Sequence, residues 1–286
     1  MPPAAVLDTD TYNEEDDQFA LAYLLLSPAQ VDLQAVYAAP FHNERSNGPA
    51  DGMEKSYAEI HRIIDLARPA ARPTVLRGAT AFLPAAAAPV RSAAVDDLIA
   101  RARATADGQR LHVLAIAAIT NVAAALLLAP DIADKITIVW LGGHAPHWPD
   151  TNEFNLAQDP RAARVIFNSA APLVWIPCHP VASGLLTTVP ELRAHLAPAG
   201  ALGRYLTDLV SDGRDRPAVS KIIWDISVSA WLVNRAWTRA VTVPAPVLLD
   251  NLTWQQPTPA GRHPVSMVIQ LDRDAVFADL FAKARG

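Results

Sequence analysis

Carboxylates are unusually concentrated near the start of the chain. Six of them fall within residues 8–17: Asp8, Asp10, Glu14, Glu15, Asp16 and Asp17. Negative charge at this density is costly unless a cation neutralises it, and hard divalent cations prefer carboxylate oxygens as ligands. A solvated acidic loop with an ordinary helix cap would account for Asp16 or Asp17 alone. It would not account for the Asp8-Thr9-Asp10 pair as well, so we predict a divalent-metal site in this segment.

The elements on either side place this segment at a strand-to-helix turn. The apolar run Ala4 to Leu7 predicts a short buried strand. The spacing of apolar residues over 19–24 predicts a helix, which should end at Ser27-Pro28. The positive end of that helix dipole would offset part of the charge on the acids just before it.

Strand-length apolar runs alternate with helical patterns along the chain. Strands are expected at 31–38, 73–76, 111–116, 136–141 and 173–176, and helices at 50–67, 90–104, 121–128 and 159–169. Such alternation is typical of βαβ units, which build a mostly parallel sheet with helices on both faces. Later patterns predict helices at 191–196, 202–212, 225–237 and 274–283 and strands at 247–249 and 265–271. We therefore expect a single α/β domain over residues 1–286, with a helical insertion in its C-terminal half.

In an open α/β sheet, ligands bind beyond the carboxyl ends of the strands. The segments at these ends are Asp8 and Asp10, the loop after Ala38, the turn 116–120, Gly142-Gly143-His144, and Cys178-His179. The unusual polar residues of the chain lie at these positions. We therefore expect these segments to form one site.

Composition limits the class of protein. With 286 residues, 51% of them hydrophobic, the chain can bury a large core. A net charge of −5 argues against nucleic-acid binding, and no 18-residue apolar window predicts a membrane span. The first residues lack the features of a secretory signal, and the lone Cys178 excludes an intramolecular disulfide. The expectation is a soluble, cytoplasmic protein.

Two further stretches contain polar residues of interest. Residues 141–156 contain Asn152, Glu153 and Asn155, whose paired donors and acceptors would match the vicinal hydroxyls of a polyol, although a polar surface loop remains an alternative. In the second stretch, Asp225 enters an apolar helix and is either its N-cap or a ligand. No glycine-rich dinucleotide or phosphate loop follows a strand, and His144 and His147 lack the further ligand that a zinc site needs.

Together these stretches resemble the inosine-uridine-preferring nucleoside hydrolase family. The family motif Asp-x-Asp…Asp-Asp after the first strand is matched by Asp8, Asp10, Asp16 and Asp17. The other matching segments are Ile119-Thr120-Asn121, Gly142-Gly143, Glu153-Phe154-Asn155, Asp159-Pro160-Arg161-Ala162-Ala163 and the late Asp225. The resemblance extends from Val6 to Leu271-Asp272, nearly the whole chain.

The resemblance implies calcium-dependent hydrolysis of the N-glycosidic bond of a ribonucleoside, giving ribose and a free base. The Ca²⁺ ligands would be Asp10, Asp17, Asp225 and the backbone carbonyl of Ile116, and Asp10 would also be the general base on a metal-bound water. Asp16, Glu153 and Asn155 would bind ribose hydroxyls, with Asn152 assisting. The family also implies a homo-dimer or homo-tetramer.

This chain departs from the family pattern in its first and second loops. The first loop is two residues longer and adds Glu14 and Glu15. These two are either solvated loop acids, which we favour, or part of what makes the specificity of this member differ. Many members have an asparagine at the end of the second strand. That position falls near Phe41 here, so Asn43 would bind substrate only if the loop bends differently.

A third departure concerns the leaving group. Many members have a histidine before the late aspartate to protonate the leaving base, whereas this chain has Trp224. Trp224 could stack on the base, and the proton could come from His42, His144, His147 or Tyr12. We therefore expect a substrate preference away from the commonest nucleosides. The alternative is a nucleoside- or ribose-binding protein of the same fold without turnover; a metal-dependent phosphohydrolase is less favoured, because the motifs contain no basic residue for a phosphate.

Overall fold

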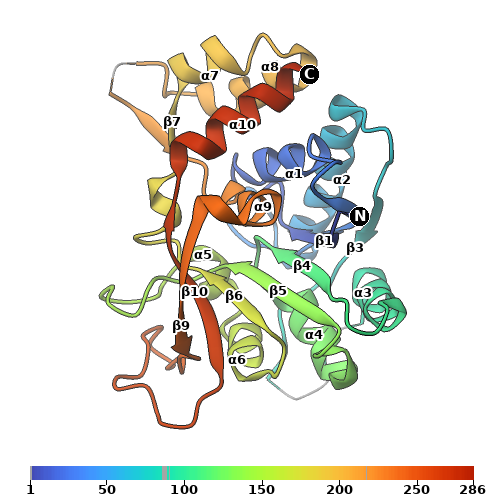
Figure 1. Ribbon diagram of the computed structural model, residues 1–286, viewed down its shortest axis with the longest axis vertical. Helices are drawn as coiled ribbons and strands as arrows, with labels where there is room; N and C mark the ends of the chain where they lie inside the picture. The colour runs from blue at the N-terminus through green and yellow to red at the C-terminus, as the bar shows by residue number, and fades with distance from the viewer. Residues whose placement is uncertain (1, 86–88, 90, 217) are drawn as a thin grey trace.

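One large sheet forms the centre of the molecule (Figure 1). The computed structural model describes residues 2–85, 89, 91–216 and 218–286. Within these residues the sheet contains β1 (Ala4–Thr9), β2 (Asp32–Ala38), β3 (Thr74–Arg77), β4 (Leu111–Ala115), β5 (Ile136–Leu141), β6 (Leu173–Ile176), β9 (Thr238–Pro244) and β10 (Pro264–Leu271). Their order is β3-β2-β1-β4-β5-β6-β10-β9, and every pair of neighbours is parallel except β10 and β9.

Helices cover both faces of this sheet (Figure 1). One face packs against α1 (Asp17–Leu25), α2 (Pro49–Ala67), α9 (Ile226–Val233) and α10 (Arg273–Arg285), and the other against α3 (Ala93–Ala104), α4 (Thr120–Leu128) and α6 (Pro160–Asn168). Successive strand residues alternate between these two cores: Leu7 belongs to the first and Val6 to the second. Because both faces are buried, the inner strands are apolar almost throughout. The predicted mostly parallel sheet with helices on both faces is confirmed.

The predicted helical insertion lies between β6 and α9. It contains β7 (Leu186–Thr188), α7 (Val189–His195), α8 (Gly200–Ser211) and β8 (Ser220–Ile222), with β7 and β8 paired antiparallel. A short helix, α5 (Phe154–Gln158), also precedes α6. β7, β8 and α5 are too short to produce a periodic sequence pattern, so none of the three was predicted. No helix in the described part of the chain combines the length and apolarity needed to cross a membrane.

Two predicted helices have different ends in the structure. The helix expected from Val90 begins at Ala93, after the cap Ser92, and Val90 itself lies outside the described residues. The helix expected over 225–237 ends at Val233. It ends there because Asn234 adopts an extended backbone, and its side chain accepts a hydrogen bond from the Ala236 N–H at 3.1 Å.

The prediction of a strand at 247–249 is wrong. Leu248 makes one isolated bridge with Trp254, whereas the strand at this edge of the sheet is β9. Most of β9 is exposed, so it lacks the apolar run by which buried strands are recognised. The apolar character of 247–249 instead reflects Leu248, which is buried against the second core.

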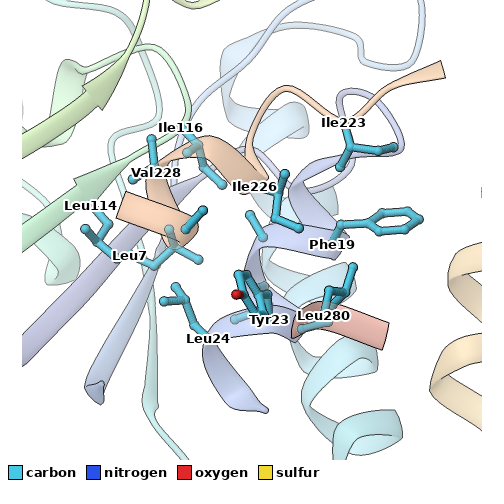
Figure 2. Close-up of a cluster of buried hydrophobic side chains, with 14 of the residues drawn as sticks. Leu7, Phe19, Tyr23, Leu24, Leu114, Ile116, Ile223, Ile226, Val228 and Leu280 are labelled. Carbon is cyan, nitrogen blue, oxygen red and sulfur yellow. The ribbon is translucent and has the colours of Figure 1, made fainter. Parts of the chain in front are cut away.

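An apolar cluster joins the sheet to α1 and α9 (Figure 2). Leu7 and Leu114 from the strands meet Phe19 from α1 and Ile226 from α9 there. The Ser229 hydroxyl of α9 also donates a hydrogen bond of 2.9 Å to the Ala20 carbonyl of α1. This packing fixes the N-terminal ends of the two helices relative to the carboxyl ends of the central strands.

Gly78, directly after β3, generates a prediction about stability. Its N–H donates to the Ala38 carbonyl at 3.0 Å, and a Cβ at this position would lie 2.2 Å from that oxygen and 2.4 Å from Asn121 Nδ2. Gly78→Ala should therefore lower the free energy of unfolding by about 1–3 kcal/mol in a urea titration. Gly184→Ala is the control, since among the described residues other than its own chain neighbours no atom lies within 4 Å of its Cβ position. Equal unfolding midpoints for the two variants would contradict this account.

Candidate active site

The candidate site lies where the sheet order changes direction. The chain runs from β1 outward to β2 and β3 and then returns as β4 on the other side of β1. Ligands bind at such switch points in open α/β sheets. Asp10 follows β1 and Ile116 follows β4, and the Ile116 N–H donates to the Asp8 carbonyl at 2.9 Å.

Four buried aspartates from distant parts of the sequence meet here. Asp10 and Asp17 have no exposed surface, and Asp16 and Asp225 are nearly as buried. One carboxylate oxygen from each of Asp16, Asp17 and Asp225 lies within 4.8 Å of the others. Asp10 faces the same cluster: burial raises its pKa well above the usual range, and the neighbouring Asp17 carboxylate raises it further.

Several oxygens of this cluster have no hydrogen-bond partner among the described residues. They are both carboxylate oxygens of Asp10 and Oδ2 of Asp17, while Asp17 Oδ1 accepts from the Thr9 hydroxyl at 2.5 Å. Neither Asp16 nor Asp225 makes a side-chain capping bond, although each occupies the N-cap position of a helix. Helix capping therefore does not explain these acids. Buried oxygens left without donors fit a divalent cation with oxygen ligands.

Burial also changes the acidity of the surrounding carboxyl groups. It raises the pKa of Asp16 to about 8 and that of Asp17 to about 6. Asp8 lies behind the cluster, where burial raises its pKa to about 7 although Asn121 Nδ2 donates to it at 2.7 Å. Without a bound cation, part of this negative charge is neutralised by protons near neutral pH.

A pocket of about 220 Å³ opens beside the aspartates. Its lining includes the predicted residues Asp16, His144, Asn152, Glu153, Asn155, Trp224 and Asp225. It also includes Asn13, which was not predicted as a site residue, and Cys178 and His179, which belong to a strand-end segment expected at the site but were assigned no role. Of the strand-end segments expected to form one site, those after β5 and β6 contribute to this pocket, whereas the loop after Ala38 and the turn 116–120 are not among its lining residues.

Hydrogen bonds to backbone groups hold the polar side chains of one wall of the pocket. The Glu153 carboxylate caps α5 by accepting from the Asn155 and Leu156 N–H groups at 2.9 and 3.1 Å, and it also accepts from the Gly143 N–H at 2.7 Å. Asn155 Nδ2 donates to the Leu141 carbonyl at 3.1 Å. Glu153 and Asn155 thus keep fixed positions, while Asn152 lies exposed at the rim. Fixed carboxylate and amide groups of this kind can bind sugar hydroxyls.

The sequence and fold have recognised relatives. The chain is 34% identical over 97 residues to a putative pyrimidine-specific ribonucleoside hydrolase, RihB, of Shigella boydii, a segment covering 32% of this chain and 39% of that protein. It is 33% identical over 125 residues to a non-specific ribonucleoside hydrolase, RihC, of Shigella flexneri, covering 42% of this chain and 40% of that protein. The aligned segments thus span well under half of either relative.

The structure of a plant nucleoside hydrolase, PpNRh1, superimposes over the whole of both chains, with a TM-score of 0.77 at 20% identity. The sequence model described as inosine-uridine preferring nucleoside hydrolase matches residues 5–278. The chain belongs to this nucleoside hydrolase family.

This member of the family differs from the expected arrangement at Asn43. Asn43 is not part of the pocket lining; its Nδ2 lies 3.3 Å from both the carbonyl and the Oδ1 of Asn13. Asn13 does line the pocket, and its N–H donates to the Asp10 carbonyl at 2.7 Å. A role of Asn43 in substrate binding stays a prediction, and the contacts favour one exerted through Asn13. No sequence signal distinguished Asn13 from other loop residues.

The candidate proton donors differ in whether they line the pocket. His42, His147 and Tyr12 are absent from the pocket lining, whereas His144 and His179 are part of it. His179 directly follows the buried Cys178, beyond the carboxyl end of β6. Its position after a strand had placed it in a segment expected at the site, but no sequence signal assigned it a role.

The expectation of solvated acids in the longer loop is wrong for Glu15. This side chain is buried and forms an ion pair with Arg45, and its Oε2 lies 3.5 Å from Lys221 Nζ and 3.6 Å from Arg214 Nη2. Glu14 is half exposed, with its carboxylate 2.5 Å from the same lysine. Cations from three other segments therefore anchor the longer loop, which brings Asn13 to the pocket.

The buried acids give metal-free protein a definite pH dependence of stability. In the folded protein the pKa of Asp16 is about 8 and that of Asp17 about 6, whereas an aspartate in the unfolded chain has a pKa of about 3.9. Between the folded and unfolded pKa values the folded state therefore binds more protons than the unfolded state. The free energy of unfolding should therefore increase as pH falls from about 8 to about 5. Denaturant titrations of chelator-treated protein measure this, and Asp17→Asn should reduce the slope. A free energy that decreases over this range in both proteins would contradict the prediction.

The contacts of Glu15 lead to a second prediction for this site. Glu15→Ala leaves Arg45 and Lys221 without a shared partner and should lower the free energy of unfolding by about 1–3 kcal/mol. Asp107→Ala provides the matched control, because Asp107 is fully exposed where it pairs with Lys135 at 2.5 Å. Surface pairs contribute little, so the control should leave the unfolding midpoint almost unchanged. Equal effects would show that the Glu15 pairs do not anchor the loop.

Proposed function

We propose that this protein is a calcium-dependent hydrolase that cleaves the N-glycosidic bond of a ribonucleoside to give ribose and a free base. The observation that carries the proposal is the buried aspartate cluster, whose unpartnered oxygens on Asp10 and Asp17 lie beside a pocket with a polar wall. The similarity to RihB, described as a putative ribonucleoside hydrolase, and to RihC, described as a non-specific one, supports the same reaction class. Assembly as a homo-dimer or homo-tetramer stays a prediction.

The donor set is suited to calcium. Asp10, Asp17 and Asp225 would hold the ion together with the Ile116 backbone carbonyl, all of them oxygen donors. Ca²⁺ accepts six to eight oxygen ligands in flexible geometry, which leaves positions for water and for sugar hydroxyls. When bound, the ion would lower the pKa of a water ligand and neutralise the charge of the cluster.

The remaining chemistry falls to groups of the chain. Asp10 accepts the proton of the attacking water as general base. Asp16, Glu153 and Asn155 bind the ribose hydroxyls and orient the sugar, and Asn152 closes the rim. Positive charge develops on the sugar as the glycosidic bond breaks, and the nearby carboxylates stabilise that transition state electrostatically.

A second candidate is a nucleoside-binding protein without turnover. It is favoured by Trp224, since an indole cannot protonate a leaving nitrogen. Calorimetry would support it by showing tight nucleoside binding with no ribose released during long incubation.

Substitution of the acids tests the proposed reaction. Asp17→Asn and Asp225→Ala should each lower ribose release from nucleosides by about a thousandfold or more, because metal-assisted stabilisation contributes several kcal/mol. Both should also abolish Ca²⁺ binding measured by calorimetry while preserving the circular dichroism spectrum. Asp208→Asn, an exposed aspartate on α8, is the control and should retain both properties. Full activity after exhaustive metal removal would exclude the calcium-dependent reaction.

A further inference from the structure

The proposed reaction requires a proton at the leaving nitrogen. When the bond between the sugar carbon and the base nitrogen breaks, its electron pair goes to the base, and most nucleobases are poor leaving groups as anions. A positioned acid typically contributes about 10²–10⁴-fold to such a step. Asp10 is already assigned to the water, and Glu153 is occupied as an acceptor of three backbone N–H groups. The pocket must therefore supply another donor.

Two histidines line the pocket, and their hydrogen bonds distinguish them. His144 Nδ1 accepts a hydrogen bond of 3.2 Å from the backbone N–H of His179. Neutral His144 therefore carries its proton on Nε2, and a second proton on Nδ1 would break this bond. Burial lowers the pKa of His144, consistent with a neutral ring. His144 is thus suited to hold the turn after β5 rather than to cycle a proton.

His179 occupies a different environment. Its ring stacks on Trp148 with centroids 4.9 Å apart and planes 6° from parallel. It meets Trp224 at 5.2 Å and 82°, so the two rings form a corner of the pocket. The stacked indole of Trp148 restricts the orientation of the His179 ring. The side chain is partly exposed and can therefore regain a proton from solvent.

We infer that His179 is the general acid that protonates the leaving base, while Trp224 provides the surface on which that base stacks. This inference rests on the proposed function. In the step, the glycosidic C–N bond breaks, its electron pair remains on the base nitrogen, and the His179 imidazolium gives that nitrogen its proton. The attacking water adds its hydroxyl to the sugar carbon and passes its proton to Asp10. Both side chains then exchange protons with solvent, so each returns to its starting state.

The leaving group provides the test. Wild type, His179→Gln and the control His147→Gln are assayed on inosine, adenosine, uridine and cytidine and on p-nitrophenyl β-D-ribofuranoside, whose nitrophenolate departs without protonation. His179→Gln should lower kcat on the best nucleoside by about 10²–10⁴-fold and leave the nitrophenyl riboside nearly unchanged. Retained cleavage of the nitrophenyl riboside also shows that the variant is folded. His147 is exposed on the loop after β5, and His147→Gln should match wild type on both substrates.

The outcomes separate the two hypotheses. Equal losses on nucleosides and on the nitrophenyl riboside, or no loss on either, would overturn the role of His179 while leaving the hydrolase function intact. A wild-type protein that cleaves only the nitrophenyl riboside would also overturn it. A wild-type protein that releases ribose from none of the substrates would overturn the proposed function and, with it, the inference. Trp148→Leu should lower kcat on nucleosides by a smaller factor and should also leave the nitrophenyl riboside nearly unchanged, because it removes the stacked indole but keeps the imidazole.

Discussion

The constraint on which the site depends is the confinement of several carboxylates away from water. Each is disfavoured as an anion by burial, and neighbouring charges add repulsion. The fold tolerates this because the acids lie at the N-terminal ends of α1 and α9, where the helix dipoles favour negative charge. The two helices in turn are held by apolar packing against β1 and β4 (Figure 2) and by the bond from Ser229 to Ala20. Hydrophobic burial thus offsets an electrostatic cost that a bound cation would remove.

A second set of charges lies just outside this cluster and shapes it. Lys221 contacts Glu14 and Glu15, and its charge lowers the pKa of Asp16 against the larger effect of burial. The same lysine therefore anchors the longer first loop and reduces the repulsion among the acids. Because Lys221 belongs to β8, the helical insertion contributes to the site although most of it lies away from the pocket. The longer loop and the insertion are therefore connected by the ion pairs of Lys221 with Glu14 and Glu15.

The sequence predicted well which residues follow the strands. The carboxyl ends of parallel strands all lie at one edge of the sheet, so this prediction does not require the strand order. Asp8, Asp10 and the segment around Gly143 were placed by that rule alone. It could not predict the partners of Glu15, since Arg45 and Lys221 come from segments that approach only in the folded chain. The same holds for the contact of Asn43 with Asn13, and for β9, an exposed edge strand that no apolar run marks. Local pattern thus predicts which elements form, whereas side-chain pairing across loops depends on tertiary structure.

The pocket consists of two chemically distinct halves joined at one residue. Polar groups after β1, in the 153–155 segment and at the start of α9 form one half, and the imidazoles of His144 and His179 form the other. Trp224 contacts both: its backbone N–H donates to Asp16 Oδ2 at 3.0 Å, and its ring meets His179. In the proposed reaction the first half binds the sugar, which ribonucleosides share, and the second faces the base, which varies. In that reaction Trp224 would lie between the two parts of the substrate, because its ring faces the half assigned to the base while its backbone N–H holds the Asp16 carboxylate assigned to the sugar.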